Sequence, residues 1–288
     1  MRPLISALAA LFVAGCMSTA PSGEPPIAFQ PVTLRGFDAD RGIQFSSSRT
    51  EFDTAAADKR FVLEQFTYQS DGLTVGAYIY HPARPTQRAM PVIIFNRGSF
   101  TRPAGFAEEM LVMANRYARA GFIVVAPHYR GSNGWAGRDE MGGADLHDLM
   151  NLSPLLRRIP GADASHVFLV GESRGGMMVY QALRDGFPAR AAAVWGAFTD
   201  LDALIGPGRP LARAAAQIWP DLEKDREAII TRRSAIRWAD QIKTPVLIMH
   251  GGADKDMDIE HSTRMAAELA RLGKPHRFLP FPDQTHTL

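Results

Sequence analysis

Short apolar runs alternate with amphipathic segments between residues 91 and 282, and this alternation restricts the fold more than any other feature of the sequence. The apolar runs contain few polar positions, so we expect each to be a strand buried on both faces. The segments between them carry apolar residues at helical spacing. Strands and helices in this order form a mainly parallel sheet covered on both faces, and we predict an α/β fold. The expected strands are residues 91–96, 122–129, 167–170, 190–198, 245–251 and 276–282, and the expected helices are residues 106–121, 144–159, 175–186 and 259–273.

Three segments depart from this alternation. Residues 61–82 contain two β-rich runs around an Asp-Gly pair, which predicts a hairpin. Residues 200–240 are rich in Ala and Arg, and we expect a small helical lid over the carboxyl ends of the strands, where ligands bind in such sheets. Residues 16–58 are expected to be a Pro-rich tether followed by an irregular N-terminal extension. The α/β domain is therefore expected to cover residues 59–288.

The first residues have the pattern of an export signal. In "MRPLISALAALFVAGC" one positive charge precedes an apolar core of about ten residues, too short to cross a bilayer. Val13–Cys16 resembles the lipobox of bacterial lipoproteins, in which residues 1–15 would be a signal peptide and Cys16, the only cysteine, would be acylated. Because Met17 rather than an acid follows, we expect a lipid-anchored protein of the bacterial cell envelope, on the periplasmic side of the outer membrane. A free periplasmic protein is the alternative.

Charge and composition disfavour several classes of partner. A formal net charge of +2 over 288 residues, with the basic residues scattered along the chain, does not indicate binding to nucleic acid. No group of His, Asp or Glu shows the spacing of metal ligands, so we predict no metal and no other cofactor. The sequence carries no signature of an oligomeric state.

The segment "HVFLVGESRGGMMVYQAL", residues 166–183, has the pattern G-x-S-x-G around Ser173. Chance alone gives roughly 0.1 such matches in a chain of this composition, so the context must decide. An apolar run precedes Gly171 and a helical period follows Gly175, which predicts an abrupt turn from strand to helix. The two glycines leave room for the serine hydroxyl at the end of the strand. Ser173 is the candidate nucleophile, and a structural turn serine is the alternative.

A serine hydroxyl needs a base that takes its proton and an acid that orients the base. In this kind of sheet they occur in the order serine, acid, histidine, each on a loop after a later strand. Asp254 follows the strand at 245–251, and His286 follows the last strand, so we predict them as acid and base. The alternatives that this order disfavours are His128 and His250 for the base, and Asp256, Asp258 and Asp283 for the acid.

The negative oxygen of a tetrahedral intermediate needs hydrogen-bond donors. The backbone N–H of Arg174 is the first candidate, because it opens the helix after Ser173, where the helix dipole favours negative charge. A second donor is expected from the loop after residues 91–96. It is the side chain of Asn96 or the backbone N–H of Arg97 or Gly98, and the sequence leaves the choice open.

Several segments resemble the α/β-hydrolase catalytic domain of the prolyl oligopeptidase (S9) family of serine peptidases. They are "QSDGLTVGAYIYHP", "APHYRGSNGWAG", "DLHDLMNLSPLLRRI" with the following "GESRGGMMVY", "RSAIRWADQIKTPVLIMHGGAD" and the terminal "PDQTHT", and they span about residues 60–288. The resemblance implies an α/β-hydrolase fold. It also implies that Ser173, Asp254 and His286 are nucleophile, acid and base.

The same resemblance bears on two further positions. Arg130, in "HYRG", is similar to a family arginine that braces the site, here against Asp145 or Asp148; a surface ion pair is the alternative. Many members place a tyrosine that serves the oxyanion where this chain has Asn96.

These observations predict a serine hydrolase that works through an acyl-enzyme. The resemblance favours a peptidase acting on peptides. A carboxylesterase similar to dienelactone hydrolase, acting on small esters, is the first alternative, because the same site serves both reactions. A non-catalytic envelope lipoprotein that uses the fold for binding is the alternative of another class.

Overall fold

The computed structural model describes residues 27–39, 41–99, 106–206, 208–209 and 211–288. Within them the strands form one nine-stranded sheet in the order β1-β2-β3-β5-β4-β6-β7-β8-β9. In this order, neighbouring strands among β5, β4, β6, β7, β8 and β9 are parallel. At the other edge β1, β2 and β3 pair antiparallel, and β3 also pairs antiparallel with β5. The strands are β1 (Gln30–Pro31), β2 (Phe61–Ser70), β3 (Leu73–Pro82), β4 (Met90–Asn96), β5 (Ile123–Pro127), β6 (Ala162–Glu172), β7 (Ala191–Trp195), β8 (Val246–Gly251) and β9 (His276–Phe281).

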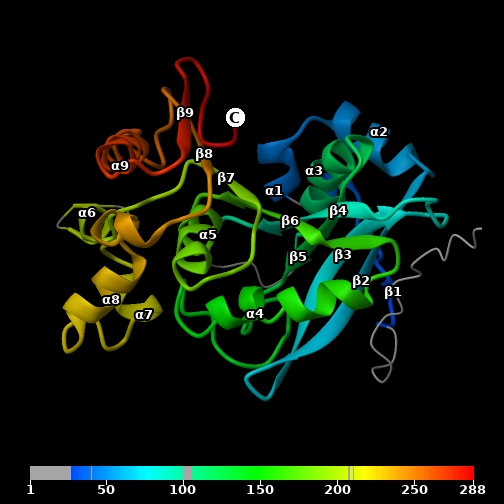
Figure 1. Cartoon of the computed structure of the whole chain (residues 1–288), viewed down its shortest axis with the longest axis horizontal. Coiled ribbons are helices and arrows are strands. Elements are labelled where there is room, and N and C mark those ends of the chain that lie inside the picture. Colours follow the sequence, from blue (N-terminus) through cyan, green and yellow to red (C-terminus); the bar gives the residue numbers. More distant parts are fainter. Residues whose placement is uncertain (1–26, 40, 100–105, 207, 210) are drawn as a thin grey trace, which may run out of the picture.

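Helices cover both faces of this sheet (Figure 1). On one face α1 (Arg41–Ser46), α2 (Arg49–Ala57) and α3 (Ala107–Arg119) enclose a core that includes Phe52 and Met110. On the other face α4 (Leu146–Met150), α5 (Arg174–Arg184) and α9 (Glu260–Arg271) enclose a larger core. The predicted α/β class and its mainly parallel sheet are confirmed.

The N-terminal extension was predicted to be irregular, but it is largely helical. Residues 41–46 form α1 and residues 49–57 form α2. The Ser48 hydroxyl accepts a hydrogen bond from the N–H of Glu51, and the Glu51 carboxylate accepts one from the N–H of Ser48, which is a capping box. Phe52 and Ala55 are buried against α3. A 3-10 helix, η1 (Phe37–Ala39), precedes them. The predicted signal peptide and Cys16 lie outside the described residues.

Two predicted elements differ in detail. The helix expected over 144–159 is divided into α4 and a 3-10 helix, η2 (Ser153–Arg158), because Pro154 has no N–H to continue an α-helix. Strand β6 begins at Ala162, before the predicted apolar run, and its pairing with β4 shifts register between Pro91 and Val92.

The segment from 200 to 240, which was predicted to be helical, contains short helices separated by turns in its described part. It contains α6 (Asp202–Ile205), α7 (Ala215–Ile218), α8 (Arg226–Arg233), η3 (Ala235–Arg237) and η4 (Ala239–Gln241). Its service as a lid stays a prediction. Across the described part of the chain, no helix combines the length and the apolar character that crossing a bilayer requires.

Candidate active site

Ser173 lies in the turn between β6 and α5, at the carboxyl end of a central strand. Its backbone has φ 52° and ψ −120°, a conformation that residues with a side chain rarely adopt. The N–H of Ser173 donates to the carbonyl oxygen of Trp195 at 2.8 Å, which ties the turn to the end of β7. The abrupt turn predicted from G-x-S-x-G is therefore present.

Close backbone packing explains why glycines flank the serine. A Cβ on Gly175 would lie 1.9 Å from the carbonyl oxygen of Asn96 at the end of β4. A Cβ on Gly171 would lie 2.5 Å from the carbonyl oxygen of Gly175. Both contacts are with backbone atoms that cannot move aside, so only glycine fits at either position.

Asp254 and His286 meet although 32 residues separate them. His286 Nδ1 donates to Asp254 Oδ2 at 2.7 Å, and the Asp254 side chain is only 1% exposed. The other carboxylate oxygen of Asp254 accepts from the N–H groups of Asp256 and Met257, each at 2.9 Å. A carboxylate held in this way keeps the imidazole oriented with its Nε2 available for a proton.

His286 also packs beside the turn that carries Ser173. A Cβ on Gly196 would lie 2.9 Å from the Cε1 and Nδ1 atoms of His286. Gly196 directly follows Trp195, the residue that accepts the hydrogen bond from the N–H of Ser173. Among the described residues the Ser173 hydroxyl makes no hydrogen bond, and in free enzymes such a bond often forms only when substrate is present.

Both alternative bases are buried and bonded elsewhere. His250 Nδ1 lies 2.7 Å from the Ser262 hydroxyl, and its Nε2 lies 3.0 Å from the carbonyl oxygen of Met257 and 3.3 Å from Asp254 Oδ2. His128 packs against the ring of Tyr78, and burial lowers its pKa to about 3. His250 is thus a second contact of Asp254 besides His286, and this contact was not predicted from the sequence.

The oxyanion donors can be narrowed from the geometry. The N–H of Arg174 opens α5, where the first N–H groups have no partner within the helix. Gly98 lies next to the nucleophile, since a Cβ added to it would lie 3.2 Å from the Cβ of Ser173. The predicted role of the Asn96 side chain is wrong. Its amide is fully buried, donates to Ile94 and Val170 carbonyls, and accepts from the Tyr129 hydroxyl.

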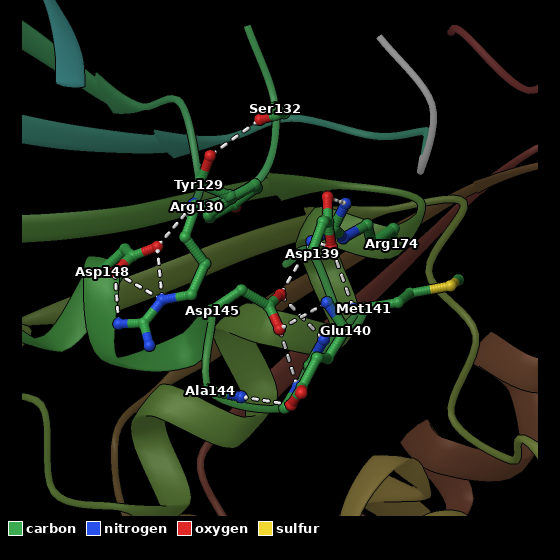
Figure 2. Close-up of polar contacts among 12 residues, drawn as sticks. Tyr129, Arg130, Ser132, Asp139, Glu140, Met141, Ala144, Asp145, Asp148 and Arg174 are labelled. Atoms are coloured by element: carbon green, nitrogen blue, oxygen red, sulfur yellow. Dashed lines mark hydrogen bonds and ion pairs between the residues drawn. The ribbon is translucent and has the colours of Figure 1, made fainter. Parts of the chain in front are cut away.

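Figure 2 shows two buried arginine–aspartate groups, one around Arg130 and one around Arg174. Arg130 donates to Asp148, with its closest contact at 2.7 Å, and also to Asp71. Its predicted partner is therefore Asp148, while Asp145 pairs with Arg174 at 2.7 Å. Burial alone lowers the pKa of Arg130, but the carboxylates of Asp148 and Asp71 raise it above its ordinary value.

One group of side chains has the composition of a metal site. Asp254, Asp256 and His286 each offer a ligand atom within 4.8 Å of the others. This group was not predicted from the sequence, because Asp254 and His286 lie 32 positions apart along the chain. Two of its three members are already joined by the hydrogen bond between acid and base, and Asp256 is exposed.

A cavity of about 540 Å³ adjoins the loop that carries the acid. It lies between α6 and the start of α9, and its lining includes Leu204, Arg209, Lys255, Asp256 and Arg264. The predicted lid segment therefore contributes to a hollow next to the Asp254 loop.

A strained serine at a strand-to-helix turn, with an acid-bound histidine on later loops of the same sheet edge, defines a serine hydrolase of the α/β-hydrolase fold. The sequence profile of the prolyl oligopeptidase family matches residues 106–288, more than half of the chain. The chain belongs to that family, and it is a hydrolase of the serine peptidase class.

Curated relatives agree with this assignment. The chain is 28% identical over 220 residues to the uncharacterized peptidase YtmA of Bacillus subtilis, covering 76% of this chain and 84% of that protein. It is 26% identical over 245 residues to the human acylamino-acid-releasing enzyme, covering 78% of this chain but 32% of the human protein. The chain thus spans about a third of the length of the human enzyme.

Solved structures show the same fold. An acylaminoacyl peptidase in complex with Z-Gly-Gly-Phe-chloromethyl ketone superposes with a TM-score of 0.63 at 25% identity, over 79% of this chain and 38% of that chain. A puromycin hydrolase superposes with a TM-score of 0.66 at 23% identity, over 77% of this chain and 35% of that chain. The predicted α/β-hydrolase fold is confirmed.

Proposed function

We propose that this chain cleaves peptide bonds through an acyl-enzyme formed on Ser173. The observation that carries the proposal is the hydrogen bond from His286 to the buried Asp254, formed beside the strained turn of Ser173. The relatives named as peptidases support the choice of a peptide substrate.

The reaction follows from the positions of these groups. His286 Nε2 takes the hydroxyl proton as Ser173 Oγ attacks the carbonyl carbon, and the N–H groups of Arg174 and Gly98 hold the oxygen that becomes negative. His286 then gives its proton to the amine, which leaves. Water then attacks the acyl carbon while His286 takes its proton. The bond between that carbon and Ser173 Oγ breaks, His286 gives the proton to Oγ, and the acid product is released.

A fluorophosphonate probe tests the nucleophile. The purified chain without residues 1–16 is compared with its Ser173→Ala variant. We expect labelling of the first alone, with loss of hydrolysis in the variant. Equal labelling of both would contradict the proposal and favour a binding protein.

Matched substrates then test the class of bond that is cleaved. A peptide amide and an aryl ester with the same acyl group are offered to the wild-type chain. A peptidase hydrolyses both, and the amide cleavage depends on Ser173. Hydrolysis of the ester alone would identify a carboxylesterase instead.

We further propose that acylation of Cys16 holds the enzyme at the bacterial cell envelope. The apolar core followed by Val13–Cys16 supports this. Several acyl chains, at about 0.8 kcal/mol per buried CH₂, suffice for stable anchoring. In membrane fractionation the wild type is expected in the membrane pellet and the Cys16→Ser variant in the soluble fraction. The same distribution for both proteins would exclude acylation.

A further inference from the structure

Two arginine side chains donate hydrogen bonds to Gly98 and Ser99, in the loop that follows β4 and lies beside the nucleophile. Arg97 Nη1 donates to the carbonyl oxygens of Gly98 and Ser99, at 3.1 and 3.0 Å. Arg174 Nη1 donates to the same oxygen of Ser99 at 3.2 Å. Ser99 has φ 62°, a left-handed conformation that is costly for a residue with a side chain. Contacts to the carbonyl groups of Gly98 and Ser99 therefore hold this described part of the loop, with Ser99 in a strained conformation.

The Arg174 guanidinium is itself fixed from below. It is 1% exposed and forms a bidentate pair with Asp139, with both contacts at 2.6 Å, and a further bond to Asp145 at 2.7 Å. Figure 2 shows Arg174 close to Asp139 and Asp145. Burial alone lowers the pKa of Arg174, but Asp139 and Asp145 raise it above its ordinary value, so the side chain stays charged.

Tyr129 joins the two arginines into one unit. Its ring lies 4.7 Å from Cζ of Arg174 and 5.2 Å from Cζ of Arg97. Its hydroxyl donates to Asn96 Oδ1 at the end of β4, immediately before the loop. The planar guanidinium groups suit this stacked arrangement, and an ammonium group does not reproduce it.

We propose that the Arg174 side chain is a positioning residue that sets the geometry of the oxyanion hole. The backbone N–H of this residue is the first donor, and its guanidinium holds the loop that contains the second donor, Gly98. Asp139 keeps the guanidinium in place. One residue thus fixes the separation of the two donors, since it contributes one and restrains the other. The inference rests on the proposed acyl-enzyme reaction.

A positioning role affects the transition state more than substrate binding. The donors are required when the carbonyl oxygen becomes negative, so a shift of the loop lowers kcat and leaves KM almost unchanged. Removal of a whole donor in such a hole costs about 10²–10³ in kcat. For a displaced donor we expect a loss of about 10- to 100-fold.

The test uses Arg174→Lys and Asp139→Asn in the full folded domain. Lysine keeps the charge but cannot contact both aspartates and Ser99 together. Each protein is given the methyl ester of an acylated amino acid and the matching thionoester, in which sulfur replaces the carbonyl oxygen. Sulfur accepts hydrogen bonds poorly, so the oxygen-to-sulfur ratio of kcat/KM reports on the oxyanion hole. We expect this ratio to fall about tenfold or more in both variants.

Asp148→Asn is the matched control. Asp148 is as buried as Asp145 and also pairs with an arginine, but its partner Arg130 bonds to the hairpin residues Ser70 and Asp71 rather than to the Ser99 loop. We expect this variant to lower Tm and to keep the wild-type ratio.

Two outcomes are decisive. If Arg174→Lys and Asp139→Asn lower Tm but keep the ratio and kcat of the wild type, the arginine is structural and the inference is wrong. The proposed function fails in a different way, since wild-type turnover would then persist in Ser173→Ala.

Discussion

Ser173 has a backbone conformation that stores strain. Its φ of 52° with ψ of −120° is tolerated because β6, α5 and the hydrogen bond to Trp195 fix the residues on either side. Strain of this kind costs about 1–3 kcal/mol. In a hydrolase it keeps the hydroxyl exposed at the strand end.

The strain can be measured with two inactive variants. Ser173→Ala retains a Cβ and therefore the strained conformation, whereas Ser173→Gly removes it. We expect the glycine variant to unfold at a higher urea concentration than the alanine variant. Its free energy of unfolding should be larger by about 1 kcal/mol, after the greater flexibility of its unfolded chain is taken into account. Both variants should fail to hydrolyse substrate. A glycine variant that is less stable than the alanine variant would show that this turn is relaxed.

The sequence predicted those site residues that are marked by a local motif or by their order along the chain. Ser173 stood in a strand–turn–helix pattern, and Asp254 and His286 followed in the expected order after later strands. Asn96 was misjudged because its position at a strand end did not reveal that its amide turns inward. Asp139 carried no signal at all. It lies in an irregular loop, and its role became visible only because the fold brings Arg174 into hydrogen-bond contact with it.

At the scale of elements, the loop between β8 and α9 determines how the acid is held. His250, at the end of β8, reaches the carbonyl oxygen of Met257 and the hydroxyl of Ser262. It also lies 3.3 Å from Asp254 Oδ2. One buried imidazole therefore connects the strand, the acid loop and the helix.

Replacement of this imidazole tests the connection. His250→Leu leaves the Met257 carbonyl and the Ser262 hydroxyl without their partner, which costs about 1–3 kcal/mol for each buried polar group. We expect a lower Tm, and a lower kcat because Asp254 orients His286 less well. Thermal unfolding and steady-state kinetics measure the two effects. A variant with reduced Tm and unchanged kcat would mean that the loop holds Asp254 without His250.

The order of strands and helices was predictable, and their ends were less so. Continuous apolar runs identified the parallel strands, because burial on both faces removes polar positions. Helix α2 was missed although Ser48 and Glu51 form the S-x-x-E pattern of a capping box. Its weak apolar periodicity concealed it, since only Phe52 and Ala55 are buried. The break at Pro154 had a signal in the sequence that was not used.

At the scale of the whole molecule, two buried histidines make stability depend on pH. Burial, with a smaller contribution from the charge of Arg97, lowers the pKa of His128 to about 3. Burial lowers the pKa of His261 to about 4. In the unfolded chain both histidines have the ordinary pKa of about 6.5. Below that pH the unfolded state binds more protons, so the free energy of unfolding falls as the pH decreases toward about 4.

Each histidine contributes about 1.4 kcal/mol per pH unit within this window, or about 2 kcal/mol between neutral pH and a pH near 5. Urea denaturation at the two pH values measures it. We expect His261→Gln to reduce the difference by roughly the contribution of one histidine. The same pH dependence in the variant as in the wild type would show that His261 is protonated in the folded protein.

Acyl transfer to Ser173 is the central step of the proposed reaction, and mass spectrometry of the trapped intermediate tests it most directly. Wild-type protein is quenched in acid during turnover of an aryl ester and digested with trypsin, which releases residues 159–174 as one peptide. We predict that this peptide gains the mass of the acyl group, that fragmentation places the group on Ser173, and that His286→Ala accumulates far less of it. Turnover with no acyl group on Ser173, or with one on another residue, would contradict the account.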